Sequence, residues 1–378
     1  MGSLSLAQLQ QLWWLLISVV GALFIFLTFV QGGQCLLFEV AKNESEKSLV
    51  INSLGKKWEL TFTTLVLFGG ALFAAFPLFY ATSFGGAYWV WMLILFTFIL
   101  QAVSYEFRKK PNNLLGAKVY EVFLYINGSI GVILIGAAIG TFFTGSNFSL
   151  NDYNSVTWQS PTRGLEAAFN LFNLSFGLFL LFVARILGAL YLNNNIDHPA
   201  LRERTRNAAF TNLLFLLPFL LYILFSLVTM QGYAINPETG KVFLEKGKYL
   251  HNLLAMPIHG LGFLLVGLLL VIYGIVMAKF MKSVKGIWPA GLGVVLVVLA
   301  VLFTAGFNNT AFYPSSYDLQ SSLSIVNASS SHYTLTAMSY IAISIPFILA
   351  YIIYVWSLLD AKKLTEEDLT AEMSDEKY

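Results

Sequence analysis

The sequence is poor in charge. Only 11% of its 378 residues are Asp, Glu, Lys or Arg, whereas soluble proteins contain about 25%. Hydrophobic residues make up 57% of the chain, so water alone does not suit it as a solvent. The net charge is only +2, and the lysines and arginines do not gather into the basic face that a nucleic-acid partner requires. We therefore expect no nucleic acid as a partner.

The sequence also lacks the residues and motifs of familiar soluble enzymes. Cys35 is the single cysteine, which excludes an intramolecular disulfide and a cysteine-based metal cluster. The chain contains no GxxxxGK[ST], GxSxG or HExxH motif, and no GxGxxG after a strand. We expect no metal site and no autonomous soluble-type enzyme.

Long apolar runs recur along the whole chain. Each has close to the ~20 residues that a helix needs to cross ~30 Å of hydrocarbon while satisfying its own backbone hydrogen bonds. The runs cover residues 12–30, 61–80, 87–103, 120–143, 167–191, 208–230, 253–281, 289–307 and 335–358. They predict an all-α polytopic membrane protein, with residues 1–378 as one membrane domain. Residues 360–378 form a polar tail, which we expect to be a short helix or a frayed end.

The basic residues between these runs predict the orientation of the protein. Seventeen lysines and arginines lie in the odd-numbered connections and the tail, against four in the even-numbered connections. Because basic loops stay in the cytoplasm, the C-terminal tail is expected inside and the N-terminus outside. The outer connection 308–334 is long and carries no lysine or arginine, which is typical of a packed cap or a partner contact.

Few ionisable residues fall within or beside the apolar runs, where a central charge costs at least ~2.5 kcal/mol. Glu59 follows Trp58 at the cytoplasmic start of the second run. This position suits a group that takes up protons from inside, and equally an interfacial carboxylate stabilised by the helix dipole. Arg185 fits either snorkelling to the headgroups or an internal ion pair. Glu121 is most simply a carboxylate at a helix start.

Polar uncharged residues also interrupt the runs. Gln31 and Gln34 flank two glycines at the end of the first run, and Gln101 lies near the end of the third. Their amides suit either a polar path or hydrogen bonds between helices. His251 and His259 would share one face if their stretch were helical throughout, but heme ligation needs an imidazole facing a ring-sized cavity. No other signal here supports a heme.

Several stretches resemble subunit II of the cytochrome bd quinol oxidases. The second-helix signature of that family has INS, a Trp-acid pair and GGALFAA in succession, as in residues 51–81, INSLGKKWELTFTTLVLFGGALFAAFPLFYA. Residues 313–335, YPSSYDLQSSLSIVNASSSHYTL, resemble its outer cap before the last helix. LRERTR at 201–206, KLTEEDL at 363–369 and WWLL at 13–16 are similar too. The resemblance therefore spans nearly the whole chain.

The resemblance implies a heterodimeric enzyme of the bacterial plasma membrane that oxidises quinol and reduces oxygen to water in the respiratory chain. It implies that subunit I holds two b hemes and one heme d, while subunit II is a nine-helix partner with two four-helix bundles and a peripheral helix. The resemblance also implies quinol as the substrate and membrane lipid as the surroundings. A quinone bound to this chain is compatible with the same family. No catalytic residue is expected in this chain.

The family has an acidic residue directly after the tryptophan of its second helix, and Glu59 occupies that position here. The resemblance therefore implies a proton-path role for Glu59, with Trp58 packed beside it. Two departures matter as much. Gln31 and Gln34 stand where many members carry acidic residues, and Gln101 replaces an arginine of the third helix. Roles that need those charges do not carry over to these positions. The leading hypothesis is an oxidase subunit, and the alternatives are a secondary transporter or a structural scaffold.

Overall fold

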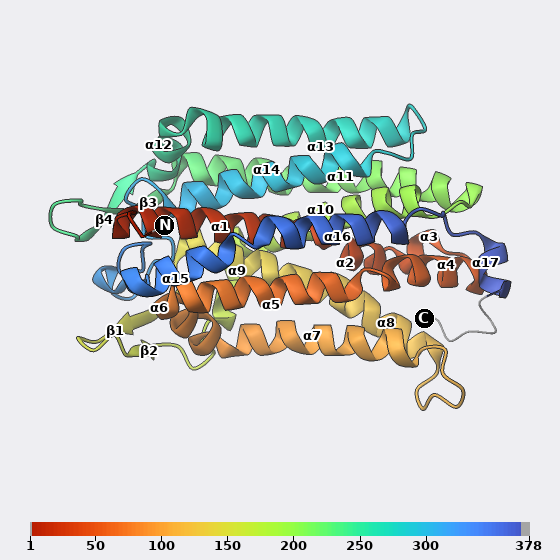
Figure 1. Ribbon diagram of the computed structural model, residues 1–378, viewed down its shortest axis with the longest axis horizontal. Helices are drawn as coiled ribbons and strands as arrows, with labels where there is room; N and C mark the ends of the chain where they lie inside the picture. Colours follow the sequence, from red (N-terminus) through yellow and green to blue (C-terminus); the bar gives the residue numbers. More distant parts are fainter. Residues whose placement is uncertain (1, 372–378) are drawn as a thin grey trace.

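The computed structural model describes residues 2–371 and is a long bundle of helices (Figure 1). Within these residues, nine helices are long and apolar enough to cross a membrane. The prediction of an all-α polytopic membrane protein is confirmed. The long helices lie nearly along one axis, with α3, α4 and α17 at one end (Figure 1). The connections at this end carry most of the basic residues. We call this the basic end, and the end with the β-strands the opposite end.

The first four spans form one helix group. Their elements, with the short helices that join them, are α1 (Leu6–Leu27), α2 (Phe29–Cys35), α3 (Leu37–Val40), α4 (Glu44–Gly55), α5 (Trp58–Ala75), α6 (Pro77–Tyr80), α7 (Tyr88–Phe107), α8 (Ala117–Ile126) and α9 (Val132–Thr144). Two segments with the wider π-helical winding interrupt them, Ala81–Gly86 and Asn127–Gly131.

The next four spans form a second helix group, followed by a ninth span. The elements are α10 (Leu171–Asn195), α11 (Pro199–Thr229), α12 (Lys248–Ala255), a π-helical segment (Pro257–Gly262), α13 (Phe263–Lys279), α14 (Ile287–Gly306), α15 (His332–Ala342), α16 (Ile345–Leu359) and α17 (Glu366–Ala371). The predicted tail helix is thus present over Glu366–Ala371, and residues 372–378 lie outside the described residues.

Prolines shorten two of the predicted spans, because a proline lacks the backbone N–H that continues a helix. Helix α5 ends at Ala75, just before Pro77, although the apolar run continues to residue 80. The run 253–281 is broken between α12 and Pro257. The stretch is therefore not helical throughout, so the condition under which His251 and His259 would share a face is not met.

The two groups meet closely where α2 crosses α10. A Cβ atom on Gly32 would lie 1.8 Å from the carbonyl oxygen of Ala184, and one on Gly188 would lie 2.3 Å from the backbone nitrogen of Gly33. Only glycine permits such an approach of two backbones. The side chains of Gln31 and Gln34, on either side of this crossing, are thereby held inside the protein.

Two hairpins and the connection before α15 close the opposite end. The hairpins are antiparallel pairs of short strands, β1 (Phe148–Leu150) with β2 (Val156–Trp158) and β3 (Gln231–Ile235) with β4 (Val242–Lys246). Phe312, Tyr313 and Leu323 of the connection are buried, and Tyr313 and Leu323 form a β-bridge. Of the two interpretations of this connection, the structure supports the packed cap.

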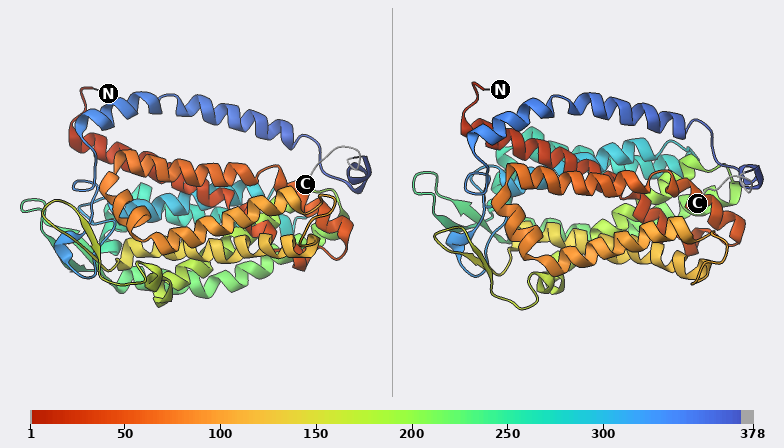
Figure 2. Two further views of the ribbon diagram at one scale, coloured as in Figure 1. Left: turned by 90° about the horizontal axis from the view of Figure 1, so that it is seen from below. Right: turned by 60° about the horizontal axis from the view of Figure 1, so that its bottom comes forward.

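The ninth span lies along the rim of the molecule, as both views of Figure 2 show. Helix α16 has no buried residue. The ninth span is attached at its two ends. At one end, the Trp13 indole donates to the Leu335 carbonyl oxygen at 3.1 Å. At the other end, Lys57 and Asn195 donate to Asp360 at 3.1 and 3.0 Å.

Candidate functional site

One face of α7 carries a buried polar stripe. Thr97, Gln101 and Tyr105 follow one another at intervals of four residues, which places them on one side of a helix. All three are buried, and the opposite side of α7 is apolar and exposed. The hydrophobic sequence thus directs the polar side chains of this helix inward, away from lipid.

Helices α2 and α5 and the segment Asn127–Gly131 supply polar side chains that face this stripe. The Gln34 amide donates to the Tyr105 hydroxyl at 3.0 Å, and the Asn127 amide donates to the Thr97 hydroxyl at 3.2 Å. The ring of Trp58 stacks on Tyr105 with 5.7 Å between centroids. We call these side chains, together with two more between the same helices, the polar column; its members are Gln31, Gln34, Trp58, Thr97, Gln101, Tyr105 and Asn127.

A glycine brings the two walls of the polar column together. A Cβ atom on Gly128 would lie 2.4 Å from the carbonyl oxygen of Gln31 and 2.9 Å from the backbone nitrogen of Cys35. The segment that carries Asn127 therefore lies directly against α2. Gln101 lies one turn from Thr97 and one turn from Tyr105, so it occupies the middle of the polar column.

Seven buried polar atoms of this column have no hydrogen-bond partner among the described residues. They are both amide atoms of Gln31 and of Gln101, Oε1 of Gln34, Nε1 of Trp58 and Oδ1 of Asn127. A buried polar atom left unpaired costs about 1–3 kcal/mol, and native proteins contain few of them. Seven in one place therefore mark a site whose purpose is not packing alone.

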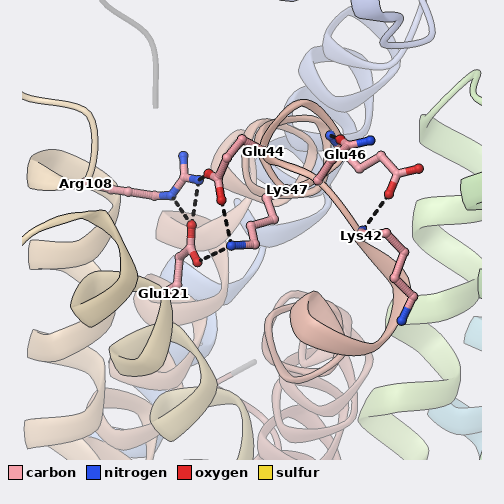
Figure 3. Close-up of polar contacts among 7 residues, drawn as sticks. Lys42, Glu44, Glu46, Lys47, Arg108 and Glu121 are labelled. Atoms are coloured by element: carbon pink, nitrogen blue, oxygen red, sulfur yellow. Dashed lines mark hydrogen bonds and ion pairs between the residues drawn. The ribbon is translucent and has the colours of Figure 1, made fainter.

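A network of charged residues lies at the basic end, next to the polar column, and Figure 3 shows its members Glu44, Lys47, Arg108 and Glu121. Arg108 donates to Glu121 Oε1 from Nε at 3.0 Å and from Nη2 at 2.7 Å. Lys47 forms two ion pairs, one with Glu121 Oε2 at 3.0 Å and one with Glu44 Oε1 at 2.7 Å. The side chain of Glu121 is 1% exposed and that of Glu44 is 73% exposed. The network thus extends from solvent to the buried end of the stripe, one turn from Tyr105.

The structure separates Glu59 from Trp58. Trp58 points into the polar column, whereas its neighbour Glu59 lies exposed on the outer face of α5. Within residues 2–371, the Glu59 carboxylate has no ion-pair partner. The two residues are adjacent in sequence but about 100° apart around the helix. A proton-path role for Glu59 stays a prediction.

Gln31, Gln34 and Gln101 are the three predicted path amides, and the structure brings them together. Sequence reasoning missed Thr97, Tyr105 and Asn127, because hydroxyl and amide side chains within a span are common and their partners lie on other helices. It also missed the ion pair of Glu121, which joins three helices. The signal that would have found Asn127 is an amide in the middle of the run 120–143.

Arg185 forms an ion pair with Glu39, as one of its two interpretations expected, but the half-exposed Glu39 makes the pair only partly internal. Its guanidinium also donates to Asn212 Oδ1 at 2.6 Å and to Cys35 Sγ at 3.1 Å. The Arg185 side chain remains 15% exposed and that of Glu39 is 46% exposed. The pair therefore lies near the surface of the basic end, although Arg185 also contacts Cys35, the residue after Gln34 of the polar column.

A second interior feature is an apolar cavity of about 120 Å³. It lies between the two helix groups and is lined by aliphatic and aromatic side chains, among them Phe24, Leu65, Phe68, Phe179 and Val298. Among the described residues, Ser83 is the one hydroxyl side chain on its wall. An apolar cavity of this kind attracts no water.

The histidines do not fit heme iron. His251, His259 and His332 are exposed, and His198 is half-buried beside Glu366 at the basic end. His251 contacts Glu245 at 2.7 Å, and His332 contacts the carbonyl oxygen of Leu4 at 2.9 Å. None of them lines the apolar cavity. The four imidazoles therefore do not face a cavity in which a heme could be ligated.

The nine spans of the described residues, together with a buried polar column and an apolar cavity, define a polytopic membrane protein. A family model described as cytochrome bd terminal oxidase subunit II matches residues 9–359. The chain belongs to this family. The resemblance noted in the sequence is thereby confirmed.

Individual relatives agree with the family. The chain is 27% identical over 376 residues to cytochrome bd-I ubiquinol oxidase subunit 2 of Escherichia coli K12, which covers 96% of each chain. It is 25% identical over 379 residues to cytochrome bd ubiquinol oxidase subunit 2 of Bacillus subtilis 168, which covers 97% of this chain and 100% of the relative. The bd oxidase structure from Geobacillus thermodenitrificans matches with a TM-score of 0.57 at 12% identity, covering 92% of this chain and 95% of that chain.

These findings decide between the hypotheses for the function. The chain is subunit II of a cytochrome bd-type terminal quinol oxidase, an oxidoreductase of the respiratory chain. The assignment as a multi-pass bacterial membrane protein with a partner subunit follows from the same family and the nine spans. Neither the transporter nor the scaffold alternative has comparable support.

Proposed function

We propose that this chain takes up protons from the cytoplasm for the oxygen reduction that its partner catalyses, and that the polar column is the route. The observation that carries the proposal is the set of seven buried, unpaired polar atoms, continuous with a charged network that reaches the surface. Buried water typically makes about three hydrogen bonds to such atoms. A chain of water molecules along the polar column would satisfy them and relay protons.

The orientation supports this direction of uptake. The basic end carries the majority of the lysines and arginines, and basic loops remain in the cytoplasm. The C-terminal tail then lies inside and the N-terminus outside. Glu44 and Lys47 would meet cytoplasmic water, and Glu121 and Arg108 would lead protons inward from the surface.

Glutamine suits a proton path whose side chains stay neutral. Each amide offers two donors and an acceptor oxygen but does not ionise at working pH. Gln31, Gln34 and Gln101 can therefore orient water without holding a proton, where many members of the family carry charged residues. The neutral side chains also avoid the cost of a charge at membrane depth. Proton transfer in this chain would depend on the water itself.

Glu59 would act at the surface of the chain. It is the first-turn acid of α5, and below it the same helix exposes Val66, Leu67 and Phe73. A helix face of this composition suits lipid or a partner helix. We place the partner subunit there, with Glu59 facing it next to the Trp58 end of the polar column.

Subunit I is the expected partner in a heterodimer, and it would hold two b hemes, one heme d and the quinol-oxidation site. The histidine placement in this chain supports that division. The hemes supply the electron transfer and the binding of oxygen, while this chain orients water and admits protons. Membrane lipid would cover the remaining apolar surface.

The apolar cavity favours a second ligand, the prenyl tail of a quinone held structurally. Its wall of aliphatic and aromatic side chains matches a hydrocarbon chain, and the Ser83 hydroxyl is at hand for a polar group. Replacing Val298 with Phe would narrow the cavity. The quinone extracted per complex should then fall well below the wild-type content, whereas an unchanged content would reject this ligand.

The proton route is tested by Gln101→Leu in the purified complex. We expect the substitution to slow quinol-driven oxygen consumption at least tenfold, because a leucine in the middle of the polar column displaces water. Heme content should stay at the wild-type level. The control is Gln10→Leu, which removes a buried glutamine bonded to Ser329 at 2.7 Å near the opposite end. Equal turnover in the two variants would overturn the route.

Glu59→Gln tests the surface acid separately. We expect slower turnover at high pH with intact heme content, since the neutral amide no longer exchanges a proton. Glu106 is a matched control, because it is also an exposed acid at the basic end of the first helix group. If Glu59→Gln and Glu106→Gln give the same pH profile as wild type, Glu59 has no role in uptake.

A further inference from the structure

The charges at the basic end are arranged in two different ways. Around α4, several basic side chains contact carboxylates: the pairs are Lys47 and Arg108 with Glu121 and Glu44, Arg204 with Glu46, and Lys57 with Asp360. Such pairing neutralises that part of the surface. Within the described part of the chain, the basic residues around the loop between α13 and α14 are not paired with carboxylates in this way.

Five basic residues surround this loop, and we call them the basic patch: Arg206, Lys279, Lys282, Lys285 and Lys363. Arg206 donates to Asn193 Oδ1 and to the carbonyl oxygen of Lys282, both at 3.0 Å. Lys279 donates to Asn207 at 2.6 Å, and Lys363 to Asn194 at 3.3 Å. All of these acceptors are uncharged. Within residues 2–371, no member of the patch forms an ion pair with a carboxylate.

The acids near the basic patch are engaged elsewhere. Asp197 pairs with Arg202 at 2.6 Å, and Asp360 pairs with Lys57 at 3.1 Å. Glu203 is exposed on the helix of Arg206 and does not contact it within ion-pair distance. Burial and Arg202 lower the pKa of Lys363, although Asp360 and Asp197 oppose this effect. The positive charge of the patch rests mainly on its other four members. The patch therefore keeps a surplus of positive charge.

The loop is a fixed part of the fold. The amide of Asn193 donates to the carbonyl oxygen of Ser283, and the amide of Asn194 donates to that of Val284, both at 3.0 Å. These bonds attach the loop to the end of α10. Lys282 and Lys285 flank the two anchored residues, so their backbones are held in place.

Large apolar side chains lie next to the basic patch. Phe280 is 64% exposed, Met281 63% and Trp288 55%. They are the residues at the ends of α13 and α14, at the depth where spans meet headgroups. A ligand for this surface should combine an anionic group with hydrocarbon chains.

We propose that the basic patch binds the headgroup phosphate of an anionic phospholipid, with its acyl chains against Phe280, Met281 and Trp288. Basic residues on the cytoplasmic side of membrane helices attract anionic lipid headgroups. The uncharged acceptors around the patch leave its cations available for such a phosphate. A zwitterionic lipid carries its own compensating cation and should bind more weakly.

The test is lipid binding to the purified complex, measured by native mass spectrometry in detergent. The probes are phosphatidylglycerol and phosphatidylcholine with identical acyl chains. We expect the wild-type complex to prefer phosphatidylglycerol. The double variant Lys282→Gln and Lys285→Gln should bind it about 25-fold more weakly, from the typical attraction per basic residue.

The control variant is Lys42→Gln with Lys118→Gln, which removes two exposed positive charges from the basic end at the first helix group. It should retain the wild-type preference. Three results would overturn the proposal: no preference for phosphatidylglycerol in the wild-type complex, equal weakening in the two double variants, or displacement of the lipid by millimolar inorganic phosphate, which indicates a free-anion site.

Discussion

The polar column and the apolar cavity both lie inside the protein, but polar side chains form the first and apolar side chains line the second. The column presents seven unpaired donors and acceptors between α2, α5, α7 and the segment Asn127–Gly131. The cavity presents almost nothing but hydrocarbon between the two helix groups. A chain that is 57% hydrophobic fills space readily with apolar side chains. Buried polar atoms that packing does not require therefore indicate where water is used.

The largest expected effect on stability concerns the charged network at the basic end of the polar column. Glu121→Ala leaves the buried Arg108 without its main partner, so the complex should lose about 3 kcal/mol of stability. Glu44→Ala removes an exposed acid of the same network and should cost less than about 1 kcal/mol. The measurement is the denaturation midpoint of the detergent-solubilised complex. Equal losses would mean that the network is a surface feature.

A smaller effect is expected when a polar group is introduced into the cavity. Leu65 lines the cavity and is 5% exposed. Leu65→Gln buries an amide in a cavity whose wall is almost entirely hydrocarbon, and this should cost about 2 kcal/mol. The denaturation midpoint checks it. A midpoint that does not fall would show that the cavity admits water, and the contrast between the two interiors would disappear.

The smallest effect on stability is expected for the reverse substitution in the polar column. Gln101→Leu removes two unpaired atoms, so it should change the free energy of unfolding by less than about 1 kcal/mol in either direction. Turnover should nevertheless fall, as proposed above. If Gln101→Leu instead destabilises the complex as much as Leu65→Gln does, the amide of Gln101 has a structural role.

The nine spans follow from the apolar runs, because a run of about 20 apolar residues in hydrocarbon satisfies its backbone as a helix. The interior arrangement does not follow so directly. Gln31, Gln34 and Gln101 stand out in sequence as polar residues within spans, but their meeting depends on the crossing of α2 and the segment Asn127–Gly131 at Gly128. That crossing joins segments far apart in the sequence.

The placement of Glu59 shows the same limit. Sequence identifies an acid at the start of a span and cannot tell which way it points. Trp58 takes the inward position because Tyr105 of α7 offers its ring for stacking, and Glu59 is thereby turned outward. A tertiary contact between two spans, absent from the local pattern, decides which of two neighbouring residues enters the polar column.

The most direct measurement is the position of ordered water in a high-resolution density map of the complex. The account predicts water peaks at about 2.7–3.2 Å from the amides of Gln31 and Gln101 and from Nε1 of Trp58, and no water in the apolar cavity. A polar column whose amides contact only protein atoms would contradict it, and so would ordered water in both interiors.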